Sequence, residues 1–268
     1  MATTVDHQWP RRVGVLGVGL LGGSVACSIR RVRPHSTFVG LARSQQKGDQ
    51  LHRLGIVEEI ATSIEQACED CDVVVVAAPV DLIADLVRQA SAASPADCLI
   101  TDVGSTKGGI VAALSTDPIV TGKFVAAHPI AGSEKSGPEH ASATLFDGKL
   151  IVLTPGDQTD RRLLEKAETF WRLTGGNTME MGPAEHDTHL AAVSHVPHLV
   201  SALVAKMAHP QARPLVGSGW TDMTRVAAGD PTMWTAICRE NRDAIRLELQ
   251  RLSDELDRLR QILEQEDD

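Results

Sequence analysis

The 268-residue sequence contains no tyrosine, and its ten histidines outnumber its four tryptophans and four phenylalanines together. Without a phenol the protein cannot use tyrosine as a general acid, which excludes the Tyr/Lys mechanism of short-chain reductases. Long apolar runs are also missing: the longest spans about eight residues near positions 73–80, whereas a membrane span needs roughly 20. The N-terminus lacks the apolar core of a signal peptide. We therefore expect neither secretion nor a membrane anchor.

Positive charge is scarce. The chain has 26 Lys and Arg residues against 35 Asp and Glu residues, which gives a formal net charge of −9. An acidic chain without a basic block binds nucleic acid and anionic membranes poorly, so we expect neither as a partner. If the protein binds an anionic small molecule, a few local cations must recognise it.

The five cysteines indicate neither disulfides nor a metal site. Their number is odd and most lie in apolar segments, which favours reduced thiols in a cytoplasmic protein. Cys68 and Cys71 have CxxC spacing, but a zinc site would need a second pair, which the sequence does not contain. We therefore predict no bound metal.

Short β-branched runs alternate with helical stretches over the first two thirds of the chain. Strands are expected at residues 12–16, 37–41, 72–77, 98–103, 124–127 and 150–153. Helices are expected from the end of a glycine turn to about residue 31, and at residues 45–54, 80–92 and 108–114. Runs that are apolar on both faces and separated by helices are typical of a parallel sheet covered on both sides. The pattern predicts an α/β fold with a Rossmann-like, doubly wound, mainly parallel sheet.

The character of the sequence changes near Gly182 and Pro183, beyond which no segment has a convincing strand pattern. Pro183 suits the first turn of a helix. Helices are expected at residues 183–208 and 231–265, with a shorter one at 211–218. We therefore predict a dinucleotide-binding domain over residues 1–181 and an all-helical domain for substrate binding and dimerisation over residues 182–268.

The last expected helix carries an apolar seam with spacings of four and three residues, which is the a/d pattern of a coiled coil. The seam consists of Ile245, Leu249, Leu252, Leu256, Leu259 and Leu263. Such a seam must be buried, either against this chain's own helices or against a second copy. Because few other helices are available to cover it, we favour a homodimer.

A glycine turn follows the first expected strand. Gly17, Gly19 and Gly22 form a GxGxxG pattern with Leu20 and Leu21 between the last two glycines. Small residues at such a turn let the backbone approach a pyrophosphate, and the following helix N-terminus offers N–H groups and partial positive charge. The strand–turn–helix context makes this a predicted dinucleotide site.

The residues at the end of the second expected strand indicate which nicotinamide cofactor binds. Enzymes that bind NAD usually place an acidic residue there, whereas this sequence has Ala42 followed by Arg43 and Ser44. A guanidinium and a hydroxyl suit a 2′-phosphate, so we favour NADP over NAD. The alternative is that Arg43 is a solvated surface charge and either cofactor binds. Ala78 and Pro79, after a third strand, complete the predicted cofactor site.

Four further blocks carry a family resemblance. They are TDVGSTK at 101–107, HPIAGSEKSG at 128–137, SHVPH at 194–198 and GWTDMTR at 219–225. Together with GVGLLGGS at 17–24, and in this order, they make the sequence similar to the prephenate/arogenate dehydrogenase family of tyrosine biosynthesis. The resemblance covers essentially the whole chain.

The resemblance implies an oxidative decarboxylation of prephenate to 4-hydroxyphenylpyruvate. The ring alcohol is oxidised by hydride transfer to the nicotinamide, the ring carboxylate leaves as CO2, and the ring becomes aromatic. Aromatisation drives the reaction, so no metal is required. The protein has to supply a base for the hydroxyl, a fixed hydride geometry and anchors for carboxylates.

His128 is the expected general base, because it matches the family motif and histidine has a pKa near working pH. It follows an expected strand, at an edge where doubly wound sheets bind ligands. Ser105 matches the family position that binds the ring hydroxyl and orients the histidine, and it also borders the cofactor. The alternative role of Ser105 is that of a helix N-cap, and the two roles can coexist.

Arg225 and His198 are the expected substrate anchors, since an arginine can grip a carboxylate with two parallel hydrogen bonds. Pro197 should kink its helix and so direct neighbouring side chains, His195 among them, toward the substrate. His195 and His198 also have a spacing that metal ligands could use, but no carboxylate or cysteine ligand stands beside them.

Two acidic residues complete the expected substrate site. Two interpretations of Glu134 stay open: a gating ion pair with Lys135, or a solvated loop charge. At Thr221, before Asp222, the sequence departs from relatives that carry a basic residue there. An acidic pocket would suit the ammonium group of arogenate, so arogenate dehydrogenase remains the alternative, although we favour prephenate.

Two other classes of protein share part of this pattern. The β-hydroxyacid dehydrogenases share a Rossmann domain followed by helices but need a catalytic lysine, and Lys206, the only lysine after Lys166, has no such motif around it. A non-catalytic NADP-sensing module would be expected to lose the polar set of the site. All four of its members are present: Ser105, His128, His198 and Arg225.

Overall fold

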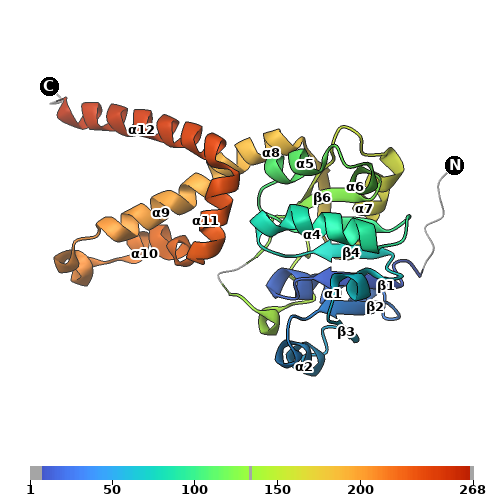
Figure 1. Cartoon of the computed structure of the whole chain (residues 1–268). Helices are drawn as coiled ribbons and strands as arrows, with labels where there is room; N and C mark the ends of the chain where they lie inside the picture. The colour runs from blue at the N-terminus through green and yellow to red at the C-terminus, as the bar shows by residue number, and fades with distance from the viewer. Residues whose placement is uncertain (1–7, 133–134, 266–268) are drawn as a thin grey trace. The chain divides into compact units, whose positions relative to one another are not determined.

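The computed structural model describes residues 8–132 and 135–265. The chain forms two compact units, Met1–His186 and Asp187–Asp268 (Figure 1). The first unit contains a sheet with helices around it, and the described part of the second is helical.

Eight strands form one sheet in the first unit, in the order β3-β2-β1-β4-β5-β6-β7-β8. Neighbouring strands from β3 to β6 are parallel, β7 is antiparallel to β6, and β8 is parallel to β7. The strands are β1 (Arg12–Leu16), β2 (Thr37–Leu41), β3 (Glu59–Ala61), β4 (Val73–Val76), β5 (Leu99–Asp102), β6 (Phe124–Pro129), β7 (Leu150–Thr154) and β8 (Asn177–Glu180). The predicted doubly wound, mainly parallel sheet is confirmed.

Helices cover both faces of this sheet. On one face, α1 (Leu20–Val32) and α7 (Arg161–Leu173) bury apolar side chains against Val73 and Val75 of β4. The alternate residues of β4 point to the other face, where α4 (Val80–Ala93) packs. The remaining helices of the unit are α2 (Gln45–Arg53), α3 (Ile64–Cys68), α5 (Gly108–Leu114), α6 (Pro118–Thr121) and the 3-10 turn η1 (Pro138–His140).

An aromatic cluster anchors the α7 side of the core. Trp171 lies edge-on to Phe146 and Phe170, with ring centroids 6.2 and 5.5 Å apart. Its indole N–H donates to Thr101 Oγ1 of β5 at 3.1 Å, so its polar atom is satisfied inside the core. Each fully buried large side chain of this kind contributes about 1.5–3 kcal/mol. The cluster therefore fixes α7 on the strand that leads to the predicted catalytic loop.

A long helical segment begins at the end of the first unit. It consists of α8 (Pro183–Leu190), a π-helical turn η2 (Ala191–His195) and α9 (Val196–Met207). Pro197 has no N–H to donate to the carbonyl of Val193 four residues earlier, and the π turn stands directly before it. The proline expected to disturb the helix therefore lies beside an irregular turn.

The expected helix at residues 231–265 is two helices, α11 (Pro231–Glu240) and α12 (Arg242–Glu264), separated at Asn241. The Asn241 side chain donates to the Asp187 carbonyl at 2.7 Å, a tertiary contact that the local sequence does not reveal. The shorter helix expected at 211–218 is a 3-10 helix, η3 (Pro210–Leu215). It is followed by α10 (Ser218–Thr224) and η4 (Arg225–Ala228).

The apolar seam of α12 divides into two halves. Ile245 is buried, and Leu249 and Leu252 pack with it against α9 and the π turn. Leu256, Leu259 and Leu263 are 56%, 52% and 78% exposed. The first half is thus covered by this chain's own helices, whereas the second half is not.

Among the described helices, Pro183–Met207 is the one segment long and apolar enough to cross a membrane by length and composition alone. One helix of this kind is weak evidence for a membrane span, since the core helices of soluble proteins pass the same test. It carries the polar side chains His186, Asp187, His195 and His198, which are all buried.

Candidate active site

The glycine turn after β1 has the shape of a dinucleotide site. Gly17 has a φ of 105°, and a Cβ there would lie 2.2 Å from the carbonyl oxygen of Ala77. A Cβ on Gly22 would lie 2.3 Å from the carbonyl of Gly17, whereas one on Gly19 would have no atom within 4 Å. Gly19 caps α1 without a side-chain hydrogen bond. The turn therefore excludes side chains where the chain packs on itself and leaves open space beside a helix N-terminus, which fits a pyrophosphate.

The other predicted cofactor residues border this turn or the neighbouring strand ends. Ala42 is buried, and Arg43 is exposed and makes no hydrogen bond or ion pair with any described residue. The Ser44 hydroxyl accepts from the Lys47 N–H at 3.3 Å and so caps α2. Ala78 and Pro79 follow β4, directly after the Ala77 carbonyl that touches Gly17. The predicted set thus follows the carboxyl ends of β1, β2 and β4.

A fully buried ion pair stands at the end of β5, and the sequence reasoning missed it. Lys107 Nζ contacts Asp102 Oδ2, and both side chains have no exposed surface. The Gly104 N–H donates to the same carboxylate at 2.8 Å, which folds residues 102–107 into a tight loop. Ser105, half-buried, lies in this loop. The signal was available, because two opposite charges five residues apart at the end of an apolar strand are unusual.

The same ion pair ties β5 to β6. The Ala127 N–H donates to Asp102 Oδ1 at 2.9 Å, and Lys107 Nζ donates to the Ala127 carbonyl at 2.9 Å. Ala127 precedes His128, so the ion pair fixes the backbone on either side of the two predicted catalytic residues. One buried network therefore holds the loop that contains Ser105, directly after β5, next to the part of β6 that leads to His128.

His128 lies within β6 rather than after it, because β6 continues to Pro129 by pairing with β7, where His128 stands opposite Val152. The ring is half-buried. Its Nδ1 lies 2.9 Å from Nε2 of His186, in α8, and the ring centroids are 5.1 Å apart. His186 is fully buried. The two histidines are 58 positions apart in the sequence, so their contact depends on the fold and could not be predicted from local pattern.

His198, in the second unit, stacks on Trp234 with ring centroids 3.5 Å apart and an interplanar angle of 6°. Burial lowers the pKa of His198, and a hydrogen bond with the Val226 backbone opposes this shift. Its ring is therefore neutral at neutral pH, so it can anchor a substrate by hydrogen bonding rather than by charge.

His195 lies deeper, with 1% of its surface exposed. Its Nδ1 is 3.1 Å from the Asn241 side-chain amide, which also donates to the Asp187 carbonyl. This network joins the π turn to the start of α12. His195 is thus held inside the second unit by contacts with the residue that separates α11 from α12.

Arg225 begins η4, is exposed, and forms no ion pair with a described residue. Asp222, in α10, is exposed and lines a groove of about 570 Å³ with Met223, Val226 and residues of α9 and α12. Glu134 lies outside the described residues. In the second unit, the structure therefore places Arg225 close in sequence and space to the His198 contact at Val226.

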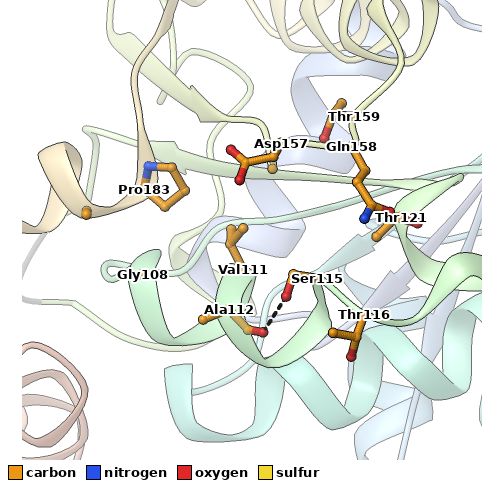
Figure 2. A pocket seen from close by; sticks show the side chains of 12 residues that line it. Gly108, Val111, Ala112, Ser115, Thr116, Thr121, Asp157, Gln158, Thr159 and Pro183 are labelled. Carbon is orange, nitrogen blue, oxygen red and sulfur yellow. Dashed lines mark hydrogen bonds between the residues drawn. The ribbon is translucent and has the colours of Figure 1, made fainter.

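A second hollow of about 480 Å³ belongs to the first unit (Figure 2). It is lined by α5, the loop after β7 and the start of α8, with Asp157, Gln158 and Thr159 among its polar groups. None of the predicted site residues lines it, and its lining includes no cationic side chain.

Within the described residues, no group of three or more His, Cys, Asp or Glu side chains is arranged to hold a metal ion. The five cysteines are free thiols. Burial raises the pKa of Cys68 and Cys98 to about 12 and that of Cys71 to about 11. These thiols are protonated at neutral pH, whereas a metal ligand must be a thiolate.

Comparison with known proteins covers both units. The family model for the prephenate dehydrogenase nucleotide-binding domain matches residues 25–180, and that for the prephenate dehydrogenase dimerization domain matches residues 182–268. Prephenate dehydrogenase of Bacillus subtilis is 33% identical over 97% of this chain and 72% of its own length. Cyclohexadienyl dehydrogenase of Zymomonas mobilis is 29% identical over 96% of this chain and 90% of its own.

Solved structures agree with the sequence comparison. Prephenate dehydrogenase from Aquifex aeolicus, in complex with hydroxyphenyl propionate and NAD+, has a TM-score of 0.87 and 33% identity, covering 97% of this chain and 92% of that one. Synechocystis arogenate dehydrogenase has a TM-score of 0.78 and 27% identity, covering 94% and 92%. The resemblance seen in the motifs is thus confirmed, and the chain belongs to the prephenate dehydrogenase family.

Proposed function

We propose that this protein oxidises and decarboxylates prephenate to 4-hydroxyphenylpyruvate with a nicotinamide cofactor, as a cytoplasmic enzyme of tyrosine biosynthesis. The observation that carries the proposal is the buried Asp102–Lys107 pair, which holds the loop of Ser105 after β5 and bonds the residue before His128 in β6. Both residues stand on the sheet edge that carries the glycine turn. The five free cysteines agree with a reducing compartment.

His128 acts as the general base in this proposal. It takes the proton of the ring hydroxyl as the C–H bond of the same carbon delivers its electron pair as hydride. A nicotinamide cofactor held at the glycine turn would supply the acceptor for that hydride. The bond from the ring to its carboxylate then breaks, CO2 leaves, and the electron pair completes the aromatic ring, which leaves a phenolate oxygen that takes the proton back from His128. Ser105 orients the hydroxyl toward His128.

In the second domain, which we place at residues 182–268, we assign Arg225 to a substrate carboxylate and the neutral His198 ring to a polar substrate atom. We also assign His195 and Asp222 of this domain, and Glu134 of the first domain, to substrate binding. The unpaired guanidinium of Arg225 supplies the local cation that an acidic chain needs for an anionic substrate.

One assay decides the activity. Purified protein is mixed with prephenate or arogenate and with NAD or NADP, and the absorbance of the reduced cofactor at about 340 nm is followed. We expect reduction with prephenate. Arogenate is the second candidate, because a solved arogenate dehydrogenase has a TM-score of 0.78 to this chain. No reduction in any of the four combinations would overturn the proposal.

Arg225→Ala is expected to raise KM for prephenate roughly 10- to 100-fold, because a charge-assisted pair of hydrogen bonds is lost. Arg225→Lys keeps the charge but not the two parallel bonds, so its KM should fall between those of the wild type and the alanine variant. Arg213→Ala, outside the proposed site, is the control. An unchanged KM for Arg225→Ala would contradict the anchor assignment.

We propose NADP as the preferred cofactor, with NAD as the alternative. Arg43 is unpaired and stands after β2, where no carboxylate repels a 2′-phosphate. Arg43→Ala should lower kcat/KM for NADP about tenfold and leave kcat/KM for NAD nearly unchanged. Arg53→Ala, at the other end of α2, is the matched control. Equal losses with both cofactors would remove Arg43 from this role.

We propose that the protein is a homodimer through its C-terminal helices. The exposed half of the α12 seam, formed by Leu256, Leu259 and Leu263, offers a surface that a second copy can cover. Sedimentation at micromolar concentration should show a dimer for the wild type and a shift to monomer for Leu259→Glu. Gln261→Glu adds the same charge on the opposite side of the helix and should stay dimeric. A wild-type monomer would defeat this proposal.

A further inference from the structure

The proposed reaction leaves one buried histidine without a role. His186 has no exposed surface, and its backbone N–H donates to the Gly182 carbonyl at 2.8 Å, which holds the first turn of α8. Its Nε2 lies 2.9 Å from Nδ1 of His128. His186 is therefore a fully buried, titratable side chain at hydrogen-bond distance from the proposed base, and the proposed reaction gives it no role.

This contact controls which nitrogen of His128 carries the proton. Two neutral imidazoles can share the hydrogen bond in two ways, since one nitrogen must donate and the other accept. If Nδ1–H of His128 donates to His186, then Nε2 of His128 has a lone pair and can take a proton. If Nε2–H of His186 donates instead, Nε2 of His128 carries a proton and cannot act as a base.

We propose that His186 is a positioning residue that accepts a hydrogen bond from Nδ1–H of His128 and so keeps Nε2 of His128 ready to receive the substrate proton. This inference rests on the proposed function of His128. The role resembles that of the aspartate in a Ser-His-Asp triad, which holds the histidine in the productive tautomer and orientation. Here the acceptor is an imidazole nitrogen instead of a carboxylate.

The geometry also suits the protonated state of the base. After His128 takes the proton, its Nδ1–H is a cationic donor, and hydrogen bonds from charged donors are about twice as strong as neutral ones. The contact therefore strengthens as the hydroxyl is oxidised. A neutral acceptor adds no negative charge next to a substrate that carries carboxylates, which a carboxylate in the same place would do.

Two substitutions of His186 distinguish a hydrogen-bond acceptor from a side chain that only fills space. His186→Gln can place its amide oxygen where Nε2 stood and so keep an acceptor, whereas His186→Met fills similar space without one. We expect His186→Met to lower kcat at least about tenfold, with KM for prephenate and cofactor affinity nearly unchanged. His186→Gln should recover most of the turnover. Equal kcat in the two variants, or a normal kcat for His186→Met, would overturn the proposal.

A second measurement depends neither on turnover nor on the His186 variants. In the ¹⁵N-histidine-labelled wild-type protein, NMR distinguishes protonated from unprotonated ring nitrogens, and His128→Asn assigns the signals. We expect His128 as its Nδ1–H tautomer, and the Nε2–H tautomer would overturn the inference. An inactive wild type would instead count against the proposed function, while the spectrum would still decide the tautomer.

Discussion

Replacing His128 by asparagine is expected to lower kcat about 100- to 10,000-fold, the usual contribution of a general base, while the substrate still binds. Asparagine has a similar size and can form hydrogen bonds, but it cannot accept the hydroxyl proton. The variant therefore removes the step assigned to Nε2 and leaves the buried Asp102–Lys107 network beside it in place. Initial rates with prephenate, followed through the reduced cofactor, give kcat, and calorimetry gives substrate affinity.

The matched control is His140→Asn. His140 is an exposed histidine in η1 of the same unit and has no proposed role, so its kcat should equal that of the wild type. A fall in affinity equal to the fall in kcat/KM would indicate that His128 binds substrate rather than takes a proton. Near-normal turnover of His128→Asn would remove it from catalysis altogether.

The sheet was predictable where its strands are buried on both faces. All four residues of β4 are buried, and its run of valines indicates a central strand without further information. The edge strands β3 and β8 were missed for the converse reason. Three of the four residues of β8 are exposed and its sequence is largely polar, so no apolar pattern marks it. Pairing with β7, rather than composition, makes it a strand.

The breaks in the C-terminal helices depend on tertiary contacts. Residues 231–265 contain no glycine and no internal proline after Pro231, so the local pattern predicts one helix. Asn241 interrupts it because its side chain bonds the Asp187 carbonyl and His195, both far away in sequence. At Pro197, by contrast, the missing N–H is a local property, and the sequence alone predicted a disturbance there.

The candidate site was predictable as a set of residues but not as a set of contacts. The motifs named Ser105 and His128, yet the partners that hold them, Asp102, Lys107 and His186, act through burial and distance. Asp102 and Lys107 lie inside a motif that the sequence singled out, but spacing alone does not show that both are fully buried. His186 reaches His128 only because α8 packs near β6.

Lys107→Met is expected to lower the free energy of unfolding by about 3–5 kcal/mol, because it leaves the fully buried Asp102 carboxylate without its counter-charge. The substitution also removes the bond from Lys107 Nζ to the Ala127 carbonyl, so the end of β6 loses part of its support. Urea unfolding followed by tryptophan fluorescence measures the loss, and the signal includes Trp171, which is bonded to Thr101 next to Asp102.

Two further variants show whether the loss comes from the charge. Lys149→Met removes an exposed lysine near β7 and should change stability by less than about 0.5 kcal/mol. The double variant Asp102→Asn/Lys107→Met removes both charges, and the asparagine oxygen can still accept from the Ala127 N–H. It should therefore be more stable than Lys107→Met alone, by about 0.5–3 kcal/mol. If Lys107→Met cost no more than Lys149→Met, the pair would not hold the loop, and the shared placement of Ser105 and His128 would need another cause.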